Sequence, residues 1–150
     1  MGRFAELGIA PEILRALDEM GFEEPSPVQE RAIPCLLQGR DVVAQALTGT
    51  GKTAAFGVPL VQKLDPSQVR PQAVVLAPTR ELAVQVSEQL TRIARYRPLA
   101  VLPIYGGQPI ERQLKALRKG VHVIVATPGR LMDHMRRGTV RLDGVRLLVL

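Results

Sequence analysis

The sequence has 150 residues, of which 46% are hydrophobic and 23% are charged, proportions ordinary for a globular domain with a core. No apolar run reaches the ~18 residues of a membrane span, and the N-terminus lacks the apolar segment of a secretory signal. A single cysteine, Cys35, forms no intrachain disulfide and fits a reducing cytoplasm. The net charge of +6 makes the chain a candidate for binding a polyanion.

Two helices are predicted before residue 40. Pro11 suits the first turn of one helix, which Gly21 ends. Ser26-Pro27 begins the second, which extends to about Gln38. Pro34 lies inside this helix and is expected to kink it.

From residue 41 onward, strands and helices are predicted to alternate. The predicted strands are 41–46, 73–77, 99–104, 121–126 and 145–150, and the predicted helices are 52–64, 80–95, 111–119 and one that begins near Gly129. Short, Val-rich strands separated by helices predict an α/β fold with a mostly parallel sheet and helices on both faces. Ligands of such folds bind outside the carboxyl ends of the strands.

A phosphate-binding loop is predicted between the first of these strands and the helix after it. Its residues are Ala46, Leu47, Thr48, Gly49, Thr50, Gly51, Lys52 and Thr53, with Ala46 in place of the usual first glycine. The two glycines let backbone N–H groups turn toward phosphate oxygens. Lys52 brings charge to the terminal phosphates, and the Thr53 hydroxyl can ligate Mg²⁺. A plain glycine turn is the alternative. The loop indicates a nucleoside triphosphate, not a particular reaction.

Residues 21–29, Gly-Phe-Glu-Glu-Pro-Ser-Pro-Val-Gln, resemble the Q motif of DEAD-box helicases. The amide of Gln29 offers donors and an acceptor, so it can pair with both N6 and N7 of adenine. The resemblance implies an adenine pocket in which Phe22 stacks on the base and Phe4 packs nearby. The alternative is a glutamine on a surface helix and two core aromatics.

Three further motifs resemble the RNA-contacting motifs of the same family. They are Pro78-Thr79-Arg80-Glu81-Leu82-Ala83, the pair Gly106-Gly107, and Thr127-Pro128-Gly129-Arg130. Thr79 and Thr127 each precede a helix and are expected to cap it. A capped helix start presents N–H groups to a phosphate, and an arginine there adds charge. The resemblance implies sequence-independent backbone contacts to one RNA strand from Pro78, Thr79, Arg80, Gly106, Gly107, Thr127, Gly129 and Arg130.

The resemblance also implies a function for the whole protein, an ATP-dependent RNA helicase of the cytoplasm that uses ATP and Mg²⁺. Lys52 and Thr53 would be its catalytic residues, and RNA and a second RecA-like domain of the same protein would be its partners. Residues 1–150 would form the N-terminal RecA-like domain, incomplete at its C-terminus, with 1–40 carrying the Q motif. The family's Asp-Glu-Ala-Asp motif is expected just after the strand 145–150, so these residues alone should bind nucleotide weakly and not hydrolyse it.

Two other functions remain open. A different P-loop enzyme, such as a DNA-translocating helicase, shares the phosphate loop but does not need the Gln29 pocket. A nucleotide- and RNA-binding module without enzymatic activity is the second. A metal site at His122 and His134 is not predicted, because no cysteine or carboxylate cluster accompanies them.

Overall fold

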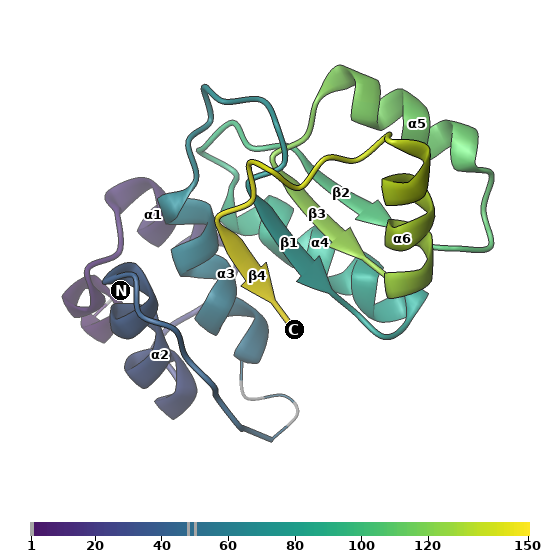
Figure 1. Cartoon of the computed structure of the whole chain (residues 1–150). Helices are drawn as coiled ribbons and strands as arrows, with labels where there is room; N and C mark the ends of the chain where they lie inside the picture. Colours follow the sequence, from purple (N-terminus) through teal and green to yellow (C-terminus); the bar gives the residue numbers. More distant parts are fainter. Residues whose placement is uncertain (1, 48, 50) are drawn as a thin grey trace. The chain divides into compact units, whose positions relative to one another are not determined.

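A computed structural model describes residues 2–47, 49 and 51–150 (Figure 1). The chain divides into two compact units. The first consists of Met1–Lys63 and Arg92–Pro98, and the second of Leu64–Thr91 and Leu99–Leu150. The Q motif and the phosphate loop therefore belong to the first unit, and the three motifs expected to bind RNA belong to the second.

The first unit is helical. It contains a 3-10 helix (Gly2–Leu7) and the helices α1 (Pro11–Glu19), α2 (Pro27–Leu37) and α3 (Lys52–Lys63). The predicted helices are confirmed, with proline in the first turn of both α1 and α2, and α2 continues through Pro34. Helix α2 packs against α3 and against the 3-10 helix. The core contains Phe4, Ile13, Leu17, Ile33, Leu60 and Val61, and each large apolar side chain stabilises the fold by roughly 1.5–3 kcal/mol when buried.

Polar contacts join the segment Arg92–Pro98 to α1 within this unit. The Tyr96 hydroxyl donates a hydrogen bond to Glu19, which also pairs with Arg95 at 3.2 Å. The Arg15 guanidinium lies 4.3 Å from the centroid of the Tyr96 ring. Arg97 pairs with Glu12 at 3.3 Å. The hydrogen bond from Tyr96, followed by the charges of Arg95 and Arg15, lowers the pKa of Glu19.

The second unit is built on a four-stranded parallel sheet. Its strands are β1 (Ala73–Leu76), β2 (Val101–Ile104), β3 (Val123–Ala126) and β4 (Leu147–Val149), in the order β2-β3-β1-β4. Its helices are α4 (Arg80–Ile93), α5 (Ile110–Lys119) and α6 (Pro128–Arg137). Ala73 is paired with Val123 on one side and Leu147 on the other. Because the strands are parallel, the loops that follow β1, β2 and β3 leave from the same edge, where the arrowheads lie in Figure 1.

Helices cover both faces of this sheet. On one face, Val74, Ile104 and Ile124 pack with Leu131 of α6 and Leu117 of α5. Residues that alternate with these, such as Val75 and Val123, are also buried, as is typical of parallel strands. In Figure 1, α4 is drawn behind the strands and α6 in front of them. The expected α/β architecture with a parallel sheet is confirmed.

The strand predicted at residues 41–46 is wrong. Residues 41–46 form no strand, and Val43, one of the apolar residues that suggested burial, is fully exposed. A strand requires a neighbour that satisfies its backbone N–H and C=O groups, and no described strand pairs with it. The other four predicted strands are present, but three of them begin two residues later than predicted.

Candidate functional site

Gln29 is a buried residue at the start of α2, with only 2% of its surface exposed. Its Oε1 accepts from the Ser26 backbone N–H at 2.9 Å, and the Ser26 hydroxyl accepts from the Gln29 N–H at 3.4 Å. This reciprocal pair is a capping box. The Gln29 Nε2 donates to the carbonyl of Gly51 at 3.1 Å. The interpretation of Gln29 as a surface-helix residue is therefore wrong, and its amide joins the Q motif to the phosphate loop.

Gly51 is required where the loop meets this amide. Its φ of +84° lies in the left-handed region that favours glycine. A Cβ atom at position 51 would lie 2.2 Å from Gln29 Nε2, closer than any van der Waals contact. The Gln29–Gly51 bond was not predicted from the sequence; the Ser-x-x-Gln spacing of residues 26–29 signals only the capping box between Ser26 and Gln29.

The two aromatics expected beside the base are in contact. The rings of Phe4 and Phe22 meet edge to face, with centroids 6.0 Å apart. Phe4 is fully buried and Phe22 is half-buried. Phe4 thus belongs to the core and packs against the Phe22 ring. The stacking of Phe22 on a base stays a prediction.

The phosphate-loop residues lead into the first turn of α3. Lys52 is the exposed first residue of that helix, and Thr53 beside it is half-buried. Gly49 has a φ of +80°, like Gly51. Ala46 and Leu47 precede them, whereas the predicted nucleotide contacts at Thr48 and Thr50 lie outside the described residues.

The loop after β1 presents the first motif expected to bind RNA. Pro78, Thr79 and Arg80 are exposed. The Thr79 hydroxyl accepts from the Leu82 N–H at 3.1 Å, so the predicted cap of α4 is confirmed. Arg80 is the first residue of α4, and its Nε lies 3.8 Å from Oε1 of the Glu81 carboxylate.

The glycine pair after β2 lies beside this arginine. Gly106 and Gly107 are both exposed. A Cβ atom at position 107 would lie 3.6 Å from Nη1 of Arg80. Two motifs distant in the sequence therefore meet at the carboxyl edge of the sheet.

The loop after β3 presents the third motif. Thr127 occupies the N-cap position of α6 and Pro128 the first helical position. The capping predicted for the Thr127 side chain is wrong, because its hydroxyl is directed to the Ile104 carbonyl at 3.5 Å. That carbonyl belongs to the adjacent strand β2 and competes with the helix for the hydroxyl. Gly129 is exposed, and Arg130 is half-buried with Nη1 donating to the Gln108 carbonyl at 3.3 Å.

Gln113 of α5 was not among the site residues predicted from the sequence. Its Oε1 accepts a hydrogen bond from Arg130 Nη1 at 3.3 Å. Gln113 also contacts His134, which is 0% exposed. Burial is the main cause of a lowered pKa for His134, and the positive charge of Arg130 adds to it. A polar residue on the buried side of an amphipathic helix was the available signal. In the part of the chain that the structure describes, no group of three His, Cys, Asp or Glu side chains could hold a metal ion.

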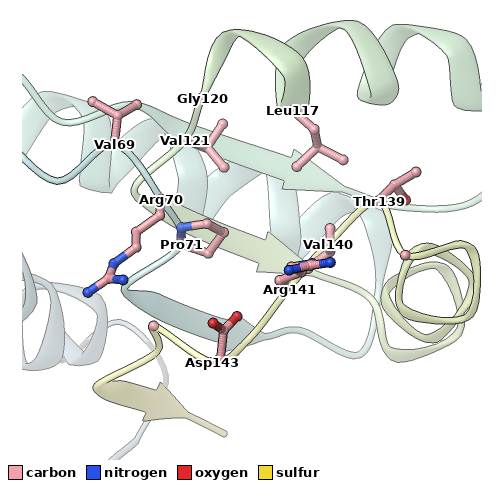
Figure 2. Close-up of a pocket in the computed structure, with 12 residues that line it drawn as sticks. Val69, Arg70, Pro71, Leu117, Gly120, Val121, Thr139, Val140, Arg141 and Asp143 are labelled. Carbon is pink, nitrogen blue, oxygen red and sulfur yellow. The ribbon is translucent and has the colours of Figure 1, made fainter.

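A pocket with a volume of about 350 Å³ lies at the other edge of this sheet. Figure 2 shows Arg70 and Pro71 before β1, Val121 before β3, and Val140 and Asp143 before β4 around it. None of the predicted site residues lines it. Because it lies at the amino ends of the strands, it is separate from the edge where ligands of parallel α/β folds bind.

Comparison with known proteins identifies the family. A family model described as DEAD/DEAH box helicase matches residues 26–150. The DEAD-box ATP-dependent RNA helicase CshA of Geobacillus kaustophilus is 56% identical over the whole chain, which covers 32% of that protein. CshA of Bacillus subtilis is 52% identical over 98% of the chain and 30% of its own length. The chain thus spans about a third of the length of these curated relatives.

Two solved structures share the fold. A DEAD box protein from the hyperthermophile Methanococcus jannaschii matches 97% of this chain and 40% of its own, with a TM-score of 0.92 and 41% identity. Saccharomyces cerevisiae Dbp5 bound to RNA and ADP BeF3 matches 97% of this chain and 37% of its own, with a TM-score of 0.85 and 37% identity. No helix among the described residues is long and apolar enough to cross a membrane. Since the family model matches most of the sequence and the Q motif is bonded to the phosphate loop, the chain belongs to the DEAD/DEAH box helicase family.

Proposed function

We propose that the whole protein is an ATP-dependent RNA helicase, in which RNA-stimulated ATP hydrolysis drives local unwinding of RNA duplexes. The observation that carries this proposal is the hydrogen bond from Gln29 Nε2 to the Gly51 carbonyl. It joins the residue expected to read adenine to the loop expected to hold the phosphates. The curated relatives are named as ATP-dependent RNA helicases, which supports the same function here.

The adenine would be read by the hydrogen-bonding capacity that Gln29 retains. Its Nε2 carries two hydrogens, one of which is directed to Gly51, and its Oε1 has two acceptor positions, one of which receives the Ser26 N–H. The remaining hydrogen suits adenine N7 and the remaining lone pair suits the N6 amino group. Guanine presents two acceptors at these positions, so the same amide pairs with it less well.

The triphosphate would lie at the start of α3. Free N–H groups of a first helical turn attract anions, and Lys52 adds a full positive charge at that turn. A Mg²⁺ ion bound with the nucleotide would neutralise part of the phosphate charge. Thr53 fits a role as its ligand, because it is half-buried directly beside Lys52.

RNA would bind the carboxyl edge of the sheet in the second unit. Arg80 and Gly107 lie close together there, and Arg130 lies in the first turn of α6, the helix that follows the neighbouring strand β3. The glycines allow a sugar–phosphate backbone to approach closely, and phosphate contacts carry no sequence information. The RNA-bound structure of a relative supports this partner.

The remainder of the catalytic apparatus would come from residues outside this chain. The relatives are about three times longer, which leaves room for a second RecA-like domain that closes on ATP and RNA. Under this proposal, residues 1–150 are the N-terminal RecA-like domain of a cytoplasmic enzyme. Taken alone, they bind nucleotide weakly and do not hydrolyse it.

The proposal is tested with variants of the full-length protein. Lys52→Ala should abolish ATP turnover while leaving the melting temperature unchanged, and Lys63→Ala at the other end of α3 is the matched control that should retain turnover. Gln29→Ala should reduce the preference for ATP over GTP in competition binding, which a bidentate amide pair sets at roughly 1–3 kcal/mol. Wild-type turnover by Lys52→Ala would contradict the phosphate-loop assignment. Equal ATP and GTP affinities in the parent would contradict the adenine pocket.

A further inference from the structure

We infer that Gln113 and His134 are positioning residues for RNA binding, which hold the Arg130 guanidinium at the carboxyl edge of the sheet. The inference rests on the proposed role of Arg130 in contacting an RNA phosphate. Neither residue belongs to a motif that resembles the family's RNA contacts. Both lie beneath the surface that carries those motifs.

Two hydrogen-bond acceptors hold the Arg130 guanidinium in place. Its Nη1 donates to the Gln108 carbonyl and to Gln113 Oε1, both at 3.3 Å. A guanidinium is planar and carries five N–H donors in a fixed arrangement. Fixing Nη1 therefore fixes the direction of the remaining donors. A phosphate at this edge would meet a guanidinium that is already oriented.

The orientation of the Gln113 amide is determined by its neighbours. Only 1% of this residue is exposed. Its Nε2 donates to the Tyr105 carbonyl at 2.8 Å, and Tyr105 directly precedes the glycine pair. Since a carbonyl only accepts and a guanidinium only donates, the amide cannot be reversed without losing both bonds. Gln113 thus connects the loop of Gly106 and Gly107 to Arg130.

His134 forms a further hydrogen bond to the Gln113 amide. Its Nε2 lies 2.7 Å from Gln113 Oε1, which can only accept, so Nε2 carries the hydrogen. Its Nδ1 lies 2.8 Å from the Thr139 hydroxyl, whose single hydrogen has two acceptors within reach, Nδ1 and the His134 backbone carbonyl at 3.1 Å. When that hydrogen is directed to Nδ1, both nitrogens of the neutral ring are satisfied without a charge. Gln113 Oε1 thereby receives two donors and uses both of its lone pairs.

The groups around His134 favour this neutral form. Burial is the largest cause of its lowered pKa, followed by the charge of Arg130; Asp133 opposes the shift and Arg137 adds to it. Asp133 is itself paired with Arg137 at 3.1 Å. A neutral ring can donate to Gln113 without placing a second buried positive charge near Arg130.

The test compares two buried glutamines of the same unit in the full-length protein. Gln113→Leu removes the acceptor for Arg130. Gln72→Leu is the matched control, because Gln72 is also 1% exposed and its amide bonds, among the described residues, to Asp65 and Gln68 at the other edge of the sheet. Affinity for single-stranded RNA, ATP affinity and melting temperature are measured for both. Gln113→Leu should bind RNA roughly 3- to 10-fold more weakly, with ATP affinity unchanged, while Gln72→Leu should retain wild-type RNA affinity.

A second pair of variants tests the histidine and does not depend on Gln113→Leu folding. His134→Gln keeps an N–H near the Nε2 position and should retain RNA affinity. His134→Leu removes the donor and should lose affinity to the same extent as Gln113→Leu. Equal RNA affinities for these two histidine variants would overturn the role of His134.

Arg130→Ala separates this inference from the function on which it rests. If Arg130→Ala binds RNA normally, the proposed RNA face is wrong. If Arg130→Ala weakens binding but Gln113→Leu does not, only the positioning role is overturned. Adding Gln113→Leu to Arg130→Ala should cost less than it does in the parent, because Gln113 acts through Arg130. Full additivity would overturn the inference.

Discussion

Two buried glutamine side chains determine the geometry of the candidate sites at the scale of single residues. Gln29 bonds to Gly51, 22 residues further along the chain, and Gln113 bonds to Arg130, 17 residues further along. Leaving a buried amide without one of its hydrogen-bond partners destabilises the folded protein by roughly 1–3 kcal/mol. Each glutamine therefore restricts the neighbouring motif to one arrangement.

Gly51→Ala should destabilise the first unit more than Gly49→Ala does. Both glycines have a positive φ, +84° and +80°, so both variants carry a similar backbone strain of about 1–2 kcal/mol. Only at position 51 does the new methyl group overlap the Gln29 amide, at 2.2 Å, while no described atom outside the adjacent residues lies within 4 Å of a Cβ at position 49. Melting temperatures of the two variants measure the difference. Equal losses would show that the Gln29 contact is not maintained in solution.

The protein should lose stability as the pH falls below about 6.5 because of His134. Its pKa in the folded state is lowered from the ordinary value of 6.5. As the pH falls, the His134 ring is therefore protonated in the unfolded chain before it is protonated in the folded protein. The free energy of unfolding decreases as the pH drops from about 6.5 toward the lowered pKa of the folded state. The slope from one such group is at most about 1.4 kcal/mol per pH unit. An NMR titration of the His134 ring and melting curves from pH 7.5 to 5 measure it. His134→Gln should flatten the curve, and an identical pH dependence in this variant would contradict the explanation.

At the scale of secondary-structure elements, the helices differ in the charge at their first turns. Helices α1, α2 and α5 have an acidic residue there, Glu12, Glu30 and Glu111, which a helix dipole favours. Helices α3 and α6 have no acidic residue in the first turn, and they carry Lys52 and Arg130 instead. Helix α4 carries both charges in its first turn, Arg80 followed by Glu81. Positive charge at a helix start is locally unfavourable, and such exceptions are typical of functional sites.

Arg80→Ala and Arg92→Ala should have opposite effects on α4. Arg80 opens the helix and Arg92 lies in its last turn, so only Arg92 interacts favourably with the dipole, by about 0.3–1 kcal/mol. Arg80→Ala should weaken binding of all RNA sequences about equally. It should also lower the log–log salt slope by about 0.7, without reducing thermal stability. Arg92→Ala should leave RNA binding unchanged and reduce stability slightly. An unaltered salt slope in Arg80→Ala would place this residue off the RNA path.

At the scale of the whole molecule, the two kinds of ligand are assigned to different units. The Q motif and phosphate loop lie in the first unit, and the three loops expected to bind RNA lie in the second. Helix α4 belongs to both, with Arg80 in the second unit and its last residues in the first. The chain itself covers only about a third of its curated relatives.

The 150 residues on their own should show no RNA-stimulated ATP turnover. Under the proposed function, Lys52 and Thr53 would bind the triphosphate, but Thr53 would offer Mg²⁺ only a single neutral oxygen. An arginine finger contributes ~10³–10⁵ to the rate in related reactions, and the proposed second domain would supply it. Phosphate release from ATP with Mg²⁺ and RNA is compared between the 150 residues and the full-length protein. Comparable rates would contradict the division of catalytic groups proposed above.

The local sequence pattern predicted the order of the helices and of four of the five expected strands, and the position of each motif. Alternating Val-rich strands and helices predicted a parallel sheet, because local periodicity reflects which side of each element is buried. The glycines of the phosphate loop and the Thr79 cap were equally predictable. Each depends on the backbone conformation within a few residues, and the short-range pattern of the chain records it.

Which of these motifs lie next to each other depends on the tertiary structure. The Gln29–Gly51 bond, the bond from Arg130 to Gln113 and the closeness of Gly107 to Arg80 all involve residues that are distant in the sequence. The errors have the same origin. Residues 41–46 have strand-like periodicity but no neighbouring strand among the described residues, and the Thr127 hydroxyl is drawn to the Ile104 carbonyl of the adjacent strand. Hydrogen bonds between elements depend on partners that a local sequence pattern does not specify.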